Sequence, residues 1–259
     1  MTTDLNITIL GCGTSTGVPM VGCSCPVCRS ADPRDRRTRS SLLIRHDGQT
    51  ILIDSSTDLR IQALREGIER VDAVLFTHAH ADHVNGIDDL RGFFFLQHQL
   101  IPCYADRFTV ATLHSFFPYI FTKREESVYS PLARTVEVDG PFQLGGLRVV
   151  PVPLDHGETP VSGYRIGNFA YLTDCRSIPD SSLPLLEGLE LLIIDGLRWK
   201  AHPTHFNIDG AVAAAAALRP ARTILTHLSH DVSYAQGERL PDGFEFACDG
   251  MSFDLPYRS

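Results

Sequence analysis

The segment Thr77–His83, THAHADH, constrains this chain more than any other part of its sequence. It places three imidazoles and one carboxylate, those of His78, His80, Asp82 and His83, within a single short stretch. Histidine and carboxylate side chains together are typical ligands of a borderline divalent metal ion. Alternation along an extended segment directs His78 and His80 to the same side, and Asp82 and His83 lie past a turn, where they can reach a second ion. The motif therefore predicts a metal centre.

Short apolar runs punctuated by glycine and aspartate predict the frame around this motif. Strands are predicted at 7–10, 41–46, 50–54, 72–77, 147–154, 162–167, 169–174, 189–195 and 222–227, and helices at 59–68 and 209–218. A turn at Asp47-Gly48 joins the second and third strands, and Asn207 or Asp209 caps the second helix. The aromatic-rich residues 92–135 match no motif, and we expect helix and loop there. Strands mixed with helices predict an α/β fold.

Four further residues of ligand type fall at the ends of predicted strands. Asp54 ends the strand ILID, and Asp174 ends FAYLTD. His156 and His227 lie at or just beyond the ends of two other strands. Strand ends hold loops rigidly, so they commonly carry functional side chains in layered α/β folds.

These motifs, taken in order over residues 7–254, resemble the metallo-β-lactamase superfamily. The resemblance implies one domain over residues 1–259, with an αββα four-layer sandwich and a dinuclear site. It implies that His78, His80 and His156 hold the first ion, that Asp82, His83 and His227 hold the second, and that Asp174 bridges the two. Asp54 orients ligands in this scheme, or is only a turn residue. Two ions about 3.5–4 Å apart can share a water and lower its pKa toward 7, which suits hydrolysis.

Three peripheral motifs narrow the resemblance to one branch. LGCGTSTGVP (10–19), GCSCPVC (22–28) and THLSH (226–230) are similar to the phosphoribosyl cyclic phosphodiesterases (the PhnP-like branch), which lie near the tRNA 3′-processing endonucleases. We therefore expect metal-activated hydroxide to open a small cyclic ribose or nucleotide phosphodiester, with Asp82 and His205 as catalytic residues. The resemblance gives His205 the role of protonating the leaving oxygen or stabilising the phosphate. The alternative for His205 is a polar contact beside the helix.

The cysteines Cys23, Cys25 and Cys28 form a second cluster. Three thiols cannot all pair with one another, and a tetrahedral metal site needs four ligands. The resembling phosphodiesterases carry the same cysteine spacing with a late histidine, which implies a structural zinc completed by His230. The alternatives are three reduced surface thiols and a simple loop histidine.

Composition separates the competing functions. The net charge of −8 makes a long nucleic acid an unexpected partner, although a tRNA 3′-processing endonuclease remains the first alternative. A lactonase or thioesterase, and a metal-dependent nucleotide-binding sensor without catalysis, are the others. We expect zinc or manganese in the catalytic site, no membrane segment, a cytoplasmic location and a homodimer. The basic stretch 29–39 is either a solvated loop or an anion contact, and Cys12 and Cys175 are either buried fillers or reactive thiols.

Overall fold

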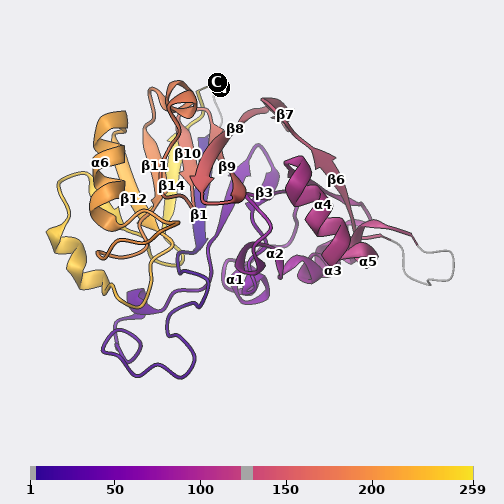
Figure 1. Ribbon diagram of the computed structural model, residues 1–259. Helices are drawn as coiled ribbons and strands as arrows, with labels where there is room; N and C mark the ends of the chain where they lie inside the picture. The colour runs from indigo at the N-terminus through magenta and orange to yellow at the C-terminus, as the bar shows by residue number, and fades with distance from the viewer. Residues whose placement is uncertain (1–3, 124–130, 259) are drawn as a thin grey trace.

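The computed structural model describes residues 4–123 and 131–258, and these residues form two seven-stranded sheets (Figure 1). The first sheet contains, in spatial order, β14 (Ser252–Pro256), β1 (Asp4–Gly11), β2 (Ser41–His46), β3 (Gln49–Ile53), β4 (Ala73–Leu75), β5 (Ile101–Ala105) and β6 (Ala133–Glu137). The second contains β13 (Phe244–Phe246), β12 (Arg222–Thr226), β11 (Leu191–Asp195), β10 (Phe169–Leu172), β9 (Thr159–Ile166), β8 (Leu147–His156) and β7 (Phe142–Leu144).

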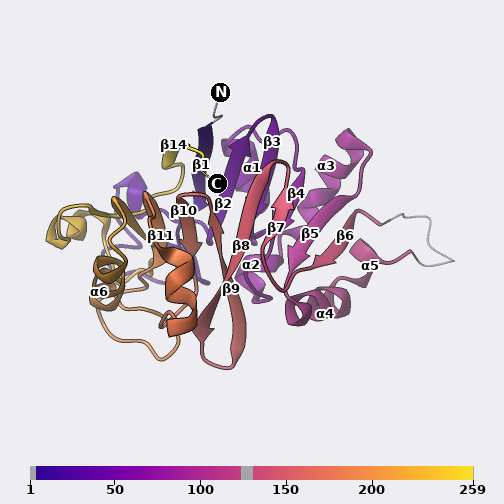
Figure 2. The ribbon, with the colours of Figure 1, turned by 90° about the horizontal axis from the view of Figure 1, so that it is seen from above.

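Helices flank both sheets (Figures 1 and 2). The α-helices are α1 (Leu59–Arg65), α2 (Ala81–Val84), α3 (Leu90–Gln97), α4 (Arg107–Phe116), α5 (Pro118–Phe121) and α6 (Ile208–Leu218). Short 3₁₀ helices are η1 (Pro33–Asp35), η2 (Ile87–Asp89), η3 (Asp180–Leu186) and η4 (Tyr234–Arg239). Of the two predicted caps for α6, the structure selects Asn207, whose side chain accepts from the backbone N–H of Gly210.

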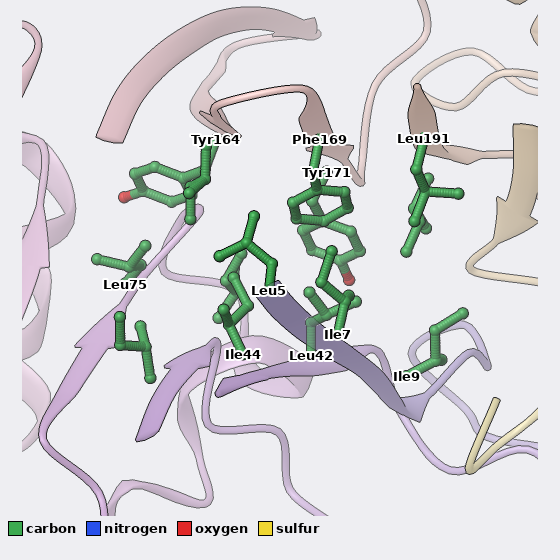
Figure 3. Close-up of a cluster of buried hydrophobic side chains, with 14 of the residues drawn as sticks. Leu5, Ile7, Ile9, Leu42, Ile44, Leu75, Tyr164, Phe169, Tyr171 and Leu191 are labelled. Atoms are coloured by element: carbon green, nitrogen blue, oxygen red, sulfur yellow. The ribbon is translucent and has the colours of Figure 1, made fainter. Parts of the chain in front are cut away.

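Three hydrophobic clusters separate four layers. The central cluster lies between the sheets, where Ile7 and Ile44 face Tyr164 and Phe169 (Figure 3). A second cluster packs the first sheet against α1 to α5, and a third packs the second sheet against α6 and η3. Apolar side chains on both faces of each sheet explain why the strands read as near-continuous hydrophobic runs. The predicted αββα sandwich is confirmed.

Hairpins and parallel strands divide the first sheet. The β2–β3 hairpin turns at the predicted Asp47-Gly48, where both residues have positive φ angles of 48° and 77°, as a type I′ turn requires. Strands β3 to β6 are parallel, so their carboxyl ends meet at one edge. That edge carries the THAHADH segment, which follows β4.

The expectation of helix and loop over 92–135 was incomplete. The segment contains most of α3, all of α4 and α5, the strand β5 and the beginning of β6 as well. Both strands are short, and β5 contains Pro102. Their own residues therefore do not predict strands, and the neighbouring strands are needed to explain them. Residues 124–130 of this segment lie outside the described residues. Within the described part of the chain, no helix has the length and apolarity required to cross a bilayer.

Candidate metal centre

The predicted ligands come together between the ends of both sheets. His78 and His80 follow β4 of the first sheet, and the four-residue helix α2 carries Asp82 and His83. The second sheet supplies the others: His156 ends β8, Asp174 follows β10, and His227 follows β12.

Three polar residues at this edge have backbone that L-amino acids rarely adopt. Asp54, Asp174 and His227 have positive φ angles of 63°, 52° and 59°. Each comes directly or two positions after a strand, so the left-handed residue ends the strand and turns the chain. The three side chains are almost fully buried.

One oxygen of Asp174 faces the first group of ligands. His78 Nε2 lies 2.9 Å from His80 Nδ1 and 3.7 Å from Asp174 Oδ2. His156 Nε2 lies 3.9 Å from the same Oδ2. The other oxygen, Oδ1, faces a different set of residues.

Three side chains surround that second oxygen and one another. His83 Nε2 and His227 Nε2 lie 3.2 and 3.3 Å from Asp174 Oδ1. Asp82 Oδ2 lies 3.4 Å from His83 Nε2 and 3.6 Å from His227 Nε2. Ligands about 2.0–2.2 Å from a tetrahedral ion stand roughly 3.3–3.6 Å apart, so the second group has suitable spacing. The distances in the first group, from 2.9 to 3.9 Å, lie on both sides of this range. The carboxylate of Asp174 separates two candidate ion positions.

Hydrogen bonds on the far side of the imidazoles fix their orientation. His83 Nδ1–H donates to Asp54 Oδ2 at 2.7 Å, and His156 Nδ1–H donates to the carbonyl of Thr204 at 2.8 Å. The Thr77 hydroxyl donates to Asp54, so its oxygen accepts from His78 Nδ1–H at 3.0 Å. Each bond leaves Nε2 with a free lone pair directed at Asp174, the arrangement that metal-binding histidines use. Asp54 therefore contacts ligands and lies outside both ligand groups.

The charges of the buried groups also fit a cation. Burial lowers the pKa of His78 well below its ordinary value. Burial opposes protonation of His227 too, but the carboxylates of Asp174 and Asp82 overcome it and raise the pKa of His227 to about 9. The Nε2 atoms of His83 and His227 are buried without a hydrogen-bond partner among the described residues. Orphaned nitrogens beside two carboxylates match the donor set of a divalent ion.

His205 lies beside this centre with a carboxylate behind it. Its ring centroid is 4.7 Å from that of His156 and 4.8 Å from that of His227. His205 Nδ1–H donates to Asp195 Oδ2 at 2.7 Å. The sequence reasoning missed Asp195, although this residue ends the predicted strand 189–195 in the same way that Asp174 ends 169–174. The strand-end rule would have found it.

The four residues of the second cluster also converge. The distances from His230 Nδ1 to the sulfurs of Cys23, Cys25 and Cys28 are 3.3, 3.5 and 3.6 Å. A tetrahedral zinc with Zn–S near 2.3 Å and Zn–N near 2.0–2.1 Å sets this separation at about 3.5 Å. The backbone N–H of Cys28 and, less strongly, the ring of His230 lower the pKa of Cys25 to about 6 against the effect of burial. A thiolate at neutral pH is the metal-binding form.

Ion pairs within the chain engage the basic stretch 29–39. Arg34 pairs with Asp32, Arg39 pairs with Asp58, and Arg37 is fully buried. Arg37 donates to the carbonyl of Ser229, next to His230. Arg37 therefore fits neither the solvated loop nor the anion contact that we expected for this stretch. Its buried guanidinium instead connects the stretch to the backbone beside His230.

The thiols beside the family motifs are structural. Cys12 and Cys175 are both fully buried, and burial raises the pKa of each well above its ordinary value. Burial thus favours the neutral thiol at both positions, in agreement with the interpretation as buried fillers.

Comparisons with known proteins agree with this geometry. A family model described as a β-lactamase superfamily domain matches residues 49–228. A crystal structure described as a new diphosphatase from the PhnP family has a TM-score of 0.91 and 43% sequence identity, and the match covers 98% of both chains.

Two curated relatives bear other names. An octanoyltransferase of Porphyromonas gingivalis is 43% identical over 249 residues, which cover 94% of this chain. The chain spans about half of that relative, because the match covers 50% of its length. A ribonuclease Z of Clostridium acetobutylicum is 35% identical over 88 residues, which cover 33% of this chain and 23% of the relative.

Proposed function

Because the chain belongs to the β-lactamase superfamily of metal-dependent hydrolases, and within it to the PhnP family, we propose that it is a dinuclear phosphodiesterase. Its substrate in this proposal is a small cyclic ribose or nucleotide phosphodiester. The observation that carries the proposal is Asp174, whose two oxygens face two separate groups of ligands.

The ligands divide between two divalent ions, zinc or manganese. His78, His80 and His156 would hold one, Asp82, His83 and His227 the other, and Asp174 both. Such a pair of ions supplies an activated water and compensates the charge that builds on a phosphoryl group. Asp82 and Asp174 bring two carboxylates, so the site carries the negative charge that hard and borderline cations prefer. A structural zinc on Cys23, Cys25, Cys28 and His230 completes the proposed metal content.

The protein's own contribution is orientation and a proton. Asp54 holds His83, and Thr204 holds His156, so the ligands are positioned before substrate arrives. The Asp195 carboxylate accepts the Nδ1–H of His205, which fixes the tautomer and the orientation of the ring. His205 then donates the proton from Nε2 to the leaving oxygen. An alkoxide needs this proton because its conjugate acid has a pKa far above 7.

A second candidate is hydrolysis of a diphosphate bridge, and the name of the 43% identical structure favours it. The two reactions share attack at phosphorus and differ in the leaving group. A departing phosphate ester is a weaker base than an alkoxide, so it needs less protonation by His205.

The other functions have less support in the site. The ribonuclease Z match covers only a third of this chain, and the net charge of −8 does not favour a tRNA. The name octanoyltransferase belongs to a protein twice as long as the match, and Cys175, the thiol nearest the site in sequence, is buried and neutral. A thioesterase would depend less on a proton donor such as His205, because a thiolate is a weaker base than an alkoxide.

The test is a substrate panel with defined metals. Zinc- or manganese-loaded protein should hydrolyse bis(p-nitrophenyl) phosphate and adenosine 2′,3′-cyclic phosphate, and ADP-ribose reports the diphosphate alternative. Pre-tRNA, a lactone and an octanoyl thioester cover the remaining functions. Turnover of the lactone or the thioester with none of the phosphates would reject the proposal.

A further inference from the structure

A cavity of about 310 Å³ lies between the start of α4 and the β8–β9 hairpin. Figures 1 and 2 show α4 and this hairpin as neighbours. Phe108 of α4 and Pro160 and Val161 of β9 supply apolar walls, and Glu137 and Asp139 supply carboxylates. The volume is at the lower end of the range of about 300–1,000 Å³ for small-molecule pockets.

The β9 strand connects this cavity to the candidate metal ligands. Pro160 lines the cavity, and the hydroxyl of the preceding residue, Thr159, lies 3.5 Å from His80 Nε2. Thr159 is also the register partner of His156. Ser162, another lining residue, donates its backbone N–H to the carbonyl of Thr77, next to His78. Adjacent residues of β9 therefore contact the metal centre and line the cavity.

The first sheet supplies further residues that line the cavity. Asp106 follows β5 and Glu137 ends β6, so both lie at the carboxyl ends of parallel strands. The THAHADH segment follows the next strand, β4, at the same edge. Ligands of α/β proteins commonly bind along such an edge.

The charges exclude a second phosphate from the cavity. Glu137 and Asp139 form no ion pair with the other residues that the structure describes, and the Asp106 carboxylate caps α4. Among the described residues that line the cavity, Arg107 is the cationic one, and its guanidinium lies 4.5 Å from the Phe108 ring centroid. Carboxylates accept hydrogen bonds from hydroxyl and amino groups, and they repel phosphate oxygens.

Phe108 supplies the flat apolar surface. Its side chain is 53% exposed, although the guanidinium of Arg107 lies over the ring. A heterocyclic base can stack on such a ring, while sugar hydroxyls and base amino groups donate to carboxylates.

We propose that this cavity binds the nucleoside part of the substrate, with the base on Phe108 and its hydroxyl and amino groups directed at Glu137 and Asp139. The proposal rests on the proposed function, because the metal centre must hold the phosphoryl group. It makes Phe108 a specificity-determining residue and selects a nucleotide over a bare ribose phosphate.

The experiment compares Phe108→Ala with Phe116→Ala. Phe116 lies at the other end of α4, is 62% exposed and does not line the cavity, so it is a matched control. Calorimetry first measures binding of adenosine, which has no phosphate and cannot be hydrolysed. Kinetics then compare adenosine 2′,3′-cyclic phosphate with the cyclic phosphate of ribose.

Phe108→Ala should weaken adenosine binding and raise KM for the cyclic nucleotide by roughly 5- to 150-fold, the range for losing one stacked base. Its kcat, and all constants for the ribose substrate, should stay within about twofold. Phe116→Ala should resemble the wild type throughout. Adenosine that does not bind, or that binds equally to Phe108→Ala, overturns the proposal. Adenosine binding at Phe108 without turnover of any phosphate ester would instead reject the proposed function and leave the nucleoside site standing.

Discussion

Asp174 is the residue on which both groups of ligands depend, because its two carboxylate oxygens face different imidazoles. Removal of this carboxylate takes Oδ2 away from His78 and His156. It also takes Oδ1 away from His83 and His227. The imidazoles would remain oriented by Asp54 and Thr204, so the loss concerns charge and bridging.

Asp174→Ala should therefore reduce the bound catalytic metal and lower activity by about 10²–10³-fold, the range for removing one group that stabilises transition-state charge. Elemental analysis of the purified protein measures metal per chain, and circular dichroism checks the fold. Full metal content together with undiminished turnover would contradict the bridging role.

His205→Ala should lower kcat by roughly 10²–10⁴-fold on adenosine 2′,3′-cyclic phosphate, the range for general acid–base catalysis. The loss should shrink on bis(p-nitrophenyl) phosphate, because p-nitrophenolate departs without a proton. Metal content should not change. Equal losses on both substrates would argue against proton donation and favour stabilisation of the phosphate.

Asp195→Asn tests whether Asp195 acts through His205. The substitution keeps the shape and removes the carboxylate that accepts the Nδ1–H of His205. It should lower kcat on the cyclic nucleotide, because the ring of His205 loses the partner that orients it. In the His205→Ala background the same change should have little further effect, since residues that act as a unit are not additive.

At the scale of elements, the loop that carries Cys23, Cys25 and Cys28 is fastened to the segment after β12. His230 approaches all three sulfurs, and Arg37 adds a buried bond to Ser229. The same segment begins with His227, only three residues before His230. A zinc ion bound by His230 would therefore restrain the backbone that carries His227, the proposed ligand of the catalytic site.

Cys25→Ser should remove one zinc per chain and leave the catalytic ions bindable. A loss of about 3 kcal/mol, ordinary for a lost structural metal, lowers Tm by roughly 6–12 °C in a chain of this size. Cys248→Ser, which changes a cysteine outside the cluster, is the control and should keep the zinc. Zinc content and Tm that match the control would show that the cluster binds no structural metal.

At the scale of the whole molecule, the metal centre joins the two sheets. His78, His80 and His83 belong to the first sheet and its α2 segment, whereas His156, Asp174 and His227 belong to the second. Without cations, a proton on His227 compensates part of the negative charge, because the carboxylates of Asp174 and Asp82 raise the pKa of His227 to about 9.

The stability of the metal-free protein should consequently depend on pH. The folded pKa of His227 exceeds the unfolded value of about 6.5, so its contribution is complete below pH 6.5 and is lost as pH rises through about 9. The stability difference between wild type and His227→Asn, both metal-free, should shrink across this window. Asparagine suits the positive φ, which makes the comparison clean. Thermal melts at pH 6 and pH 9.5 measure it, and a difference that is constant or grows with pH would refute the argument.

Sequence patterns predicted the α/β class and the strand ends that carry ligands, because both depend on features visible in short segments. The αββα sandwich and the grouping of the ligands came from the resemblance to the metallo-β-lactamase superfamily. Strand ends at Asp54, Asp174 and His227 follow from apolar runs that stop at a polar residue. Strands β5 and β6 did not follow, because their pairing with β4 comes from the sheet and not from their own residues. The dimer and the cytoplasmic location stay predictions.

The site beyond the ligands was less predictable for a physical reason. The bond from His156 to the carbonyl of Thr204 joins residues 48 positions apart, and main-chain carbonyls leave no mark in a sequence. The cavity at Phe108 likewise depends on how α4 stands against the β8–β9 hairpin.

The left-handed backbone at Asp54, Asp174 and His227 has a consequence for the descent of this fold. Each such residue costs about 1–2 kcal/mol relative to glycine, which adopts the conformation freely. A descendant relieved of selection for catalysis would gain stability by acquiring glycine at these three positions while its strands kept their turns. Glycines at these positions would mark a relative that has abandoned the chemistry.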